Sequence, residues 1–288
     1  MKRISKLLCL VISLFMLSGC FKRDNMEGIN IITSVYPIEY IVDTLYGNYA
    51  NISSIYPSGV DVYTYELTEK QIDDYSKADL FVYNGLSDEK QIARNFINKN
   101  KNMKIIDVSY GLNIEYGNTP EELWLSPNNF LMLATTIKNN LCDFISSKYI
   151  IEEINRNYND LQEKVSILDA NLRAVGYAAS SKEQETIIVS SNIFKFLENY
   201  GFKVISLEDS DTNIESIKDN FKNGNYKNLF IKKNESSDII TELKDDYKAN
   251  VIEINLMNVL DETEKGNNND YLYIMNKFLT TISDATLA

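Results

Sequence analysis

Histidine is absent from this chain of 288 residues, and prolines (four) and glycines (eleven) are few. Without histidine there is no His-based triad, imidazole general base or His metal ligand. So few prolines and glycines exclude a long flexible linker or a collagen-like segment. Basic residues are also scarce, 29 against 41 acidic ones, for a formal net charge of −12. A chain this acidic lacks the clustered Lys and Arg that phosphate contacts need, so no nucleic-acid partner is expected.

Cysteine is equally sparse, with Cys9, Cys20 and Cys142 only. Three cysteines support neither a disulfide framework nor a Cys-rich metal knuckle. Cys142 lies in an amphipathic helical pattern, where a lone Cys is usually a small core residue. The sequence also lacks a Walker motif, a Gly-x-Gly-x-x-Gly motif and a nucleophile elbow. We therefore expect a protein that is not an enzyme.

The N-terminus has the three-part layout of an export signal. Lys2, Arg3 and Lys6 precede an apolar run over residues 7–17. A run of about 11 residues is too short to cross the roughly 30 Å of a bilayer core as a helix. The run ends in Leu-Ser-Gly-Cys (17–20), which resembles the bacterial lipoprotein signal. The alternative is an ordinary secreted protein that happens to have Cys there.

The lipoprotein resemblance implies a signal peptide over residues 1–19 and a lipid anchor on Cys20. A polar tether over residues 20–29 would then hold the protein on the extracytoplasmic face of the cell membrane. Two or three acyl chains, rather than one, would make that anchoring stable.

Apolar β-rich runs alternate with helical patterns along the rest of the chain. Strands are predicted over residues 30–35, 51–57, 79–85, 103–109, 186–191, 203–208, 228–233 and 250–256. Helical patterns lie between them, including residues 36–47, 68–78, 87–99 and 192–201. This alternation predicts mainly parallel sheets covered by helices. Two sets of four units indicate an α/β protein of two (β/α)4-type lobes, over residues 30–149 and 178–288.

One long helix is predicted between the two sets. Apolar residues recur at spacings of three and four at Ile151, Ile154, Tyr158, Leu161, Val165, Leu168, Leu172 and Val175. Such a stripe predicts one buried helix face, and we place the linking helix over residues 150–177. A coiled-coil pairing segment is the alternative interpretation, but packing on the chain's own lobes is expected, and with it a monomer.

Five blocks in this order resemble the solute-binding lipoproteins of zinc and manganese ABC transporters. They are TSVYPIEYIVDTLYGN (33–48), IYPSGVDVYTYELTEKQIDDYSKADLFVYNGLSDE (55–89), LWLSP (123–127), IFKFLENYGFKVISL (193–207) and VLDETEKGNNNDYLYIMNKFLTTI (259–282). The resemblance implies two lobes joined by a long helix, with a metal ion captured between them and delivered to a membrane permease. Trp124, in the third block, is expected to anchor a lobe.

The metal ligands of that family fall on unusual residues here. The resemblance places the first ligand on Tyr63, the second on Glu122, the third on Ser190 or Ser191 and the fourth on Asp261. Only Asp261 matches the family pattern, and the His-rich loop of zinc-loading members is missing. Carboxylates with a hydroxyl and a phenol form an all-oxygen set, which suits Mn, Ca or Mg better than Zn. Tyr63 is a poor ligand at neutral pH because a phenol ordinarily ionises near pH 10.

Three interpretations of the cleft stay open at this point. It has lost tight transition-metal binding, it keeps an oxygen-ligated cation site, or it holds an unrelated small ligand with tyrosines such as Tyr36, Tyr63 and Tyr65. The first function expected is therefore metal capture for an ABC importer. The second is a diverged surface adhesin or accessory lipoprotein.

Overall fold

The computed structural model describes residues 24–267 and 269–287. The signal peptide predicted over residues 1–19 and the anchor predicted at Cys20 lie outside these described residues. Within the described part, no helix is both long and apolar enough to cross a membrane.

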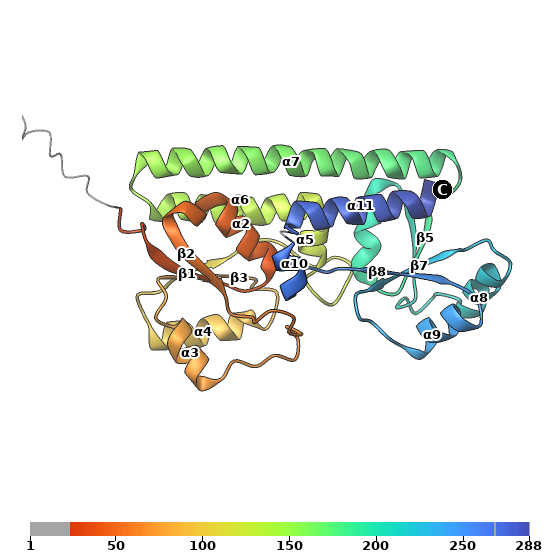
Figure 1. The fold of residues 1–288 in the computed structure, drawn as a ribbon, viewed down its shortest axis with the longest axis horizontal. Helices are drawn as coiled ribbons and strands as arrows, with labels where there is room; N and C mark the ends of the chain where they lie inside the picture. The colour runs from red at the N-terminus through yellow and green to blue at the C-terminus, as the bar shows by residue number, and fades with distance from the viewer. Residues whose placement is uncertain (1–23, 268, 288) are drawn as a thin grey trace, which may run out of the picture.

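Two four-stranded parallel sheets form the two predicted lobes (Figure 1). The N-terminal sheet has the order β2-β1-β3-β4, built from β1 (Ile29–Thr33), β2 (Ala50–Ser54), β3 (Leu80–Tyr83) and β4 (Lys104–Asp107). The C-terminal sheet has the order β6-β5-β7-β8, built from β5 (Thr186–Val189), β6 (Lys203–Ser206), β7 (Asn228–Lys232) and β8 (Asn250–Ile254). The two orders are equivalent, and every predicted strand is confirmed within a few residues.

Helices connect and cover the strands. The N-terminal lobe contains α2 (Tyr36–Tyr46), the 3-10 turn η1 (Gly47–Tyr49), α3 (Glu69–Tyr75), α4 (Glu89–Lys99), α5 (Glu122–Leu125) and α6 (Pro127–Phe144). The C-terminal lobe contains η2 (Asn192–Tyr200), α8 (Ile214–Lys222), α9 (Asp238–Asp245), α10 (Glu262–Gly266) and α11 (Tyr271–Leu287). The helix predicted over residues 192–201 is a 3-10 helix, which ends at Gly201 in the left-handed region with φ of 88°.

The linking helix α7 (Lys148–Ser181) runs the length of the molecule, with α6 along its first half and α11 along its second (Figure 1). It is longer at both ends than the predicted range 150–177. Ile154, Leu161 and Leu168 of the predicted stripe are buried, so the stripe packs on the chain's own lobes. Gly176 allows a close crossing with η2, since a Cβ there would lie 1.8 Å from the carbonyl oxygen of Tyr200.

The two lobes share one continuous apolar core through Trp124 and Tyr271. The Trp124 indole N–H of α5 donates to the carbonyl oxygen of Leu256, just after β8, at 2.7 Å. Tyr271, the first residue of α11, stacks on Phe130 of α6 with ring centroids 3.8 Å apart, and its hydroxyl donates to the Trp124 carbonyl at 2.8 Å. Trp124 therefore anchors both lobes to each other, rather than one lobe alone.

The segment predicted as a tether, residues 20–29, is partly built into the N-terminal lobe. Met26 is buried, and its carbonyl accepts a hydrogen bond from the Tyr46 hydroxyl at 2.6 Å. The Asp24 carboxylate accepts the backbone N–H groups of Ser146 and Ser147 at 2.8 and 2.7 Å, directly before α7. From residue 24 onward the segment is therefore packed structure, because it bonds the backbone directly before α7 and covers apolar surface.

Candidate functional site

A cavity of about 540 Å³ opens where loops at the carboxyl ends of the N-terminal strands meet the segment that follows β8. Its lining includes Val35, Tyr56, Val62, Tyr63, Leu86, Asp88, Glu89, Thr119, Trp124 and Asn258. Ligands of open α/β sheets commonly bind outside the carboxyl ends of the strands. The volume is in the ordinary range for a small-ligand site.

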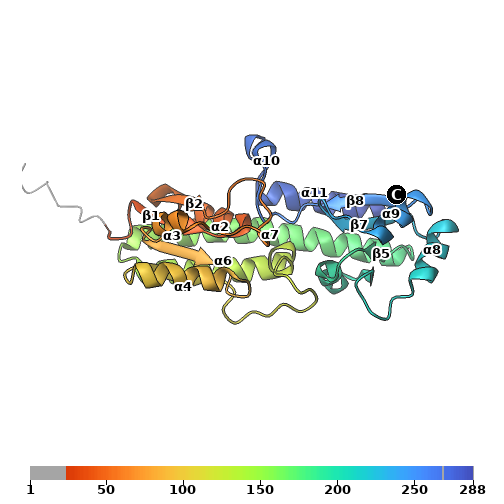
Figure 2. The ribbon, with the colours of Figure 1, turned by 90° about the horizontal axis from the view of Figure 1, so that it is seen from below.

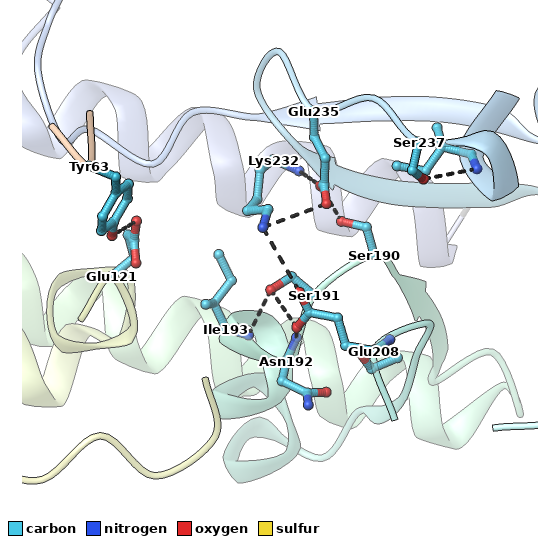
Figure 3. A network of polar contacts seen from close by, with 12 residues as sticks. Tyr63, Glu121, Ser190, Ser191, Asn192, Ile193, Glu208, Lys232, Glu235 and Ser237 are labelled. Carbon is cyan, nitrogen blue, oxygen red and sulfur yellow. Dashed lines mark hydrogen bonds and ion pairs between the residues drawn. The ribbon is translucent and has the colours of Figure 1, made fainter. Parts of the chain in front are cut away.

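Tyr63, Glu121 and Asn258 form a hydrogen-bonded group at this cavity. The Tyr63 hydroxyl donates to Glu121 Oε1 at 2.5 Å, and Asn258 Nδ2 donates to the same oxygen at 2.9 Å. Figure 3 shows the Tyr63 hydroxyl pointing toward the Glu121 carboxylate. Burial and the adjacent Glu121 carboxylate raise the pKa of the Tyr63 phenol, so Tyr63 stays protonated and acts as a donor.

Glu122 points to a different part of the structure. Its carboxylate accepts the backbone N–H groups of Glu115, of Tyr116 at 2.9 Å and of Gly117 at 3.2 Å. Successive helical residues are about 100° apart around the axis, so the two members of the Glu121-Glu122 pair face different ways. In this structure Glu122 holds the loop before α5, while Glu121 is the carboxylate bonded to Tyr63.

Ser190 and Ser191 follow β5 and belong to a polar network in the C-terminal lobe (Figure 3). Ser190 Oγ donates to Glu235 Oε2 at 2.5 Å, and Ser191 Oγ donates to Glu208 Oε2 at 2.9 Å. The Lys232 ammonium lies 3.6 Å from Glu235 Oε1 and 4.0 Å from Glu208 Oε1. Both serines therefore bond carboxylates that share one lysine as a partner.

Asp261 caps the short helix α10. Its carboxylate accepts the Glu264 backbone N–H at 2.8 Å, while the Glu264 carboxylate accepts the Asp261 N–H at 2.9 Å. Lys233 Nζ lies 3.2 Å from Asp261 Oδ2 and 2.8 Å from Glu264 Oε1. The Glu264 N–H and the Lys233 ammonium hold the pKa of the Asp261 carboxyl below its usual value. Asp261 is thus an ionised helix cap with a lysine partner.

Each of the four residues predicted as ligands bonds a different partner in this structure. Among the described residues, no hydrogen bond or ion pair joins any two of Tyr63, Glu122, Ser191 and Asp261. Nor do three or more His, Cys, Asp or Glu side chains gather to hold a metal ion anywhere in residues 24–267 and 269–287. Sequence reasoning missed Glu121 and Asn258. Glu121 could have been considered because it directly precedes the predicted ligand Glu122. Nothing in the sequence distinguishes Asn258 from other loop asparagines.

Glu89, the first residue of α4, is a buried carboxyl in the cavity lining. Its Oε2 accepts the Asn84 backbone N–H at 2.8 Å. Burial outweighs this hydrogen bond and raises the Glu89 pKa to about 7. A cation entering the cavity would favour its ionised form.

Comparison with known proteins decides the family. Residues 31–285 match the family described as zinc-uptake complex component A, periplasmic. The chain belongs to this family. The solved structure of the metal-dependent lipoprotein YcdH from Bacillus subtilis superposes on this zinc-uptake family member with a TM-score of 0.75. The two sequences are 22% identical, and the match covers 90% of this chain and 100% of that one.

Two curated relatives of this zinc-uptake family member carry metal-binding names. The zinc-binding lipoprotein AdcA of Streptococcus pneumoniae is 23% identical over 99% of this chain and 61% of its own length. The manganese ABC transporter substrate-binding lipoprotein PsaA of Streptococcus anginosus is 27% identical over 70% of each chain. The chain thus spans about three fifths of AdcA. The family name describes a component of an uptake complex, not an enzyme.

Proposed function

We propose that this chain is the lipid-anchored solute-binding component of a metal-type ABC importer. It captures a metal ion between its lobes and delivers it to a membrane permease. Three observations support the proposal: family membership over residues 31–285, the two-lobe fold, and the Leu-Ser-Gly-Cys box ending at Cys20. Cys20 would carry the anchor and place the protein on the extracytoplasmic face of the cell membrane.

The charge of the interlobe cavity carries the proposal. Asp88 and Glu89 line it, and the Glu121 carboxylate lies behind Tyr63 at its wall. Neither lysine nor arginine is among the described residues of the lining. A cavity whose only charged side chains are carboxylates attracts cations.

The donor atoms favour an oxygen-preferring cation such as Mn²⁺ over Zn²⁺. Carboxylate, amide and hydroxyl oxygens suit Mn²⁺, Mg²⁺ and Ca²⁺, whereas tight zinc sites use His nitrogen and Cys sulfur. Of the predicted ligands, Tyr63 already lies at the cavity. Glu122, Ser191 and Asp261 each already bond another group of the chain. The adhesin alternative is not favoured, since the relatives carry metal-binding names.

Ion binding by the purified mature protein tests this function. Thermal unfolding is followed after chelation and then with Mn²⁺, Mg²⁺, Ca²⁺ or Zn²⁺ added separately, and native mass spectrometry counts bound ions. An ion at 100 times its dissociation constant stabilises the folded state by about 2.7 kcal/mol. We expect the largest rise in melting temperature with Mn²⁺. Identical melting temperatures and masses with all four ions would contradict the proposal.

A further inference from the structure

Two buried oxygens at the cavity have no hydrogen-bond partner among the described residues. They are Glu121 Oε2 and Asn258 Oδ1, and both are shielded from solvent. The Glu121 side chain as a whole is 1% exposed. A buried acceptor without a partner costs about 1–3 kcal/mol, and more when it is charged. Such an arrangement is stabilised by a positively charged or hydrogen-bond-donating ligand.

The hydrogen bonds around Glu121 fix the identity of these atoms. A carboxylate only accepts hydrogen bonds, so the Asn258 amide atom 2.9 Å from Glu121 Oε1 is the donating nitrogen. The amide oxygen is therefore the unpaired atom. The two unpaired oxygens belong to groups joined by one hydrogen bond, and they lie in one small region.

The two oxygens come from opposite lobes. Glu121 directly precedes α5 of the N-terminal lobe, whereas Asn258 follows β8 of the C-terminal lobe. The Asn258 backbone is fixed as well, since its carbonyl accepts the Tyr36 N–H at 2.9 Å. A ligand that contacts both oxygens would bind the two lobes together on preformed positions.

Resting on the proposed function, we infer that Glu121 Oε2 and Asn258 Oδ1 are the direct protein ligands of the captured cation. One carboxylate oxygen and one amide oxygen leave a six-coordinate ion four positions for water. Four waters occupy about 120 Å³ at roughly 30 Å³ each, which the cavity of about 540 Å³ accommodates. The cargo is thus a partly hydrated hard cation, a class that needs fewer protein ligands than zinc does.

Tyr63 controls access to this pair and is not itself a ligand. Tyr63 and Asn258 both line the cavity and both bond Glu121, so the Glu121 carboxylate lies directly behind the cavity wall. Tyr63 is 55% exposed, so its ring lies at the surface while its hydroxyl bonds the buried Glu121. Outward rotation of this ring would open the path to the Glu121 carboxylate.

Mn²⁺ titration of four variants tests the inference. Affinity is measured by calorimetry and by electron paramagnetic resonance of free Mn²⁺, and water-proton relaxation reports the waters kept by the bound ion. Glu121→Gln preserves shape and removes the charge, and we expect at least a hundredfold loss of affinity. Asn258→Ala should lose about tenfold, and Tyr63→Phe should stay within a few fold. Glu253→Gln, an exposed carboxylate on β8, changes net charge equally and should stay within twofold of wild type.

The outcomes separate this inference from the proposed function. If wild type binds no Mn²⁺, both fail. If wild type binds Mn²⁺ and a folded Glu121→Gln protein binds it equally well, the function stands and the ligand assignment is overturned. A bound ion that has lost all its waters would also overturn it. The unfolding midpoint without metal, measured for every variant, separates loss of binding from loss of folding.

Discussion

The two halves of the cleft have the same sheet topology but differ in whether lysines accompany their carboxylates. On the N-terminal side, Glu121 keeps one oxygen unpaired and Glu89 is a buried carboxyl without a lysine partner among the described residues. On the C-terminal side, Lys232 lies against Glu208 and Glu235, and Lys233 lies against Asp261 and Glu264. The carboxylates on the N-terminal side have no lysine partner among the described residues, whereas on the C-terminal side each of two lysines lies between two carboxylates.

This difference shows on which side a chain without histidine keeps buried carboxylates that have no lysine partner among the described residues. A carboxylate without a counter-ion is costly in a buried site, and it is retained most readily where a ligand relieves that cost. The positions after β5 and β7 instead make serine–carboxylate and lysine–carboxylate contacts. This difference supports the proposed cation site on the N-terminal side, with Asn258 contributed by the other lobe.

The largest effect is expected from a substitution at the junction between the two lobes, where Tyr271 packs on Phe130. Tyr271→Ala removes a buried ring stacked on Phe130, and we expect a loss of about 3–5 kcal/mol in the free energy of unfolding. Tyr271→Phe, the matched control, loses only the hydroxyl bond to Trp124 and should cost about 1 kcal/mol. Urea denaturation followed by circular dichroism and by the fluorescence of Trp124, the chain's single tryptophan, measures both. Equal stability of the two variants would mean that the junction does not couple the lobes.

The buried carboxyl of Glu89 provides a second, pH-dependent test. Its pKa is about 7 in the folded protein against an ordinary value of 4.5, so between these pH values the folded state binds more protons than the unfolded state. The contribution of Glu89 to the free energy of unfolding is therefore largest below about pH 4.5, and it is lost as the pH rises through 7. At about 1.4 kcal/mol per pKa unit, the loss is roughly 3 kcal/mol.

Glu89→Gln should remove this pH dependence. Relative to wild type, the variant should gain stability as pH rises from 5 to 7.5, measured by urea denaturation at each pH. Asp88→Asn is the control, because it changes the same charge on an exposed neighbour. A constant difference between Glu89→Gln and wild type across this range would show that Glu89 is ionised throughout.

The smallest effect is expected from the C-terminal half, whose carboxylates have lysine partners. Lys233→Met releases the partly exposed carboxylates of Asp261 and Glu264. Ion pairs of this exposure contribute little to stability, so the unfolding midpoint should stay close to that of wild type. Mn²⁺ affinity should rise a few fold because two carboxylates near the cleft lose their counter-ion. Lys218→Met, which frees carboxylates on α8 and α9, is the matched control. Unchanged Mn²⁺ affinity in Lys233→Met would mean that the C-terminal half takes no part.

The fold could be predicted from the sequence because the spacing of apolar residues indicates which faces of the strands and helices are buried. Apolar runs such as 186–191 predict fully buried parallel strands, and β5 is buried along Ile187–Val189. The stripe from Ile151 to Val175 predicts α7, although the helix continues to Ser181 because its last turn packs against neighbours that no local pattern reveals. Asp24 illustrates the same limit, since its partners Ser146 and Ser147 lie more than 120 residues away.

The candidate site was less accessible from sequence. Motif spacing led to Glu122, but the choice between two adjacent glutamates depends on how one helical turn is oriented by Trp124 and the preceding loop. Lys232 lies three residues before its partner Glu235, but its contact with Glu208 and the contacts of Lys233 with Asp261 and Glu264 form only through tertiary structure, so local spacing does not predict them. The ligand roles of Tyr63, Glu122, Ser191 and Asp261 stay predictions.

The position of Tyr271 also bears on the timing of folding. The N-terminal lobe completes its aromatic centre with a ring from α11, which is synthesised after every other described element. A nascent chain holding residues 24–260 lacks that ring, and the gap beside Phe130 stays unfilled. The packing between the two lobes is therefore completed only after the last helix has been synthesised.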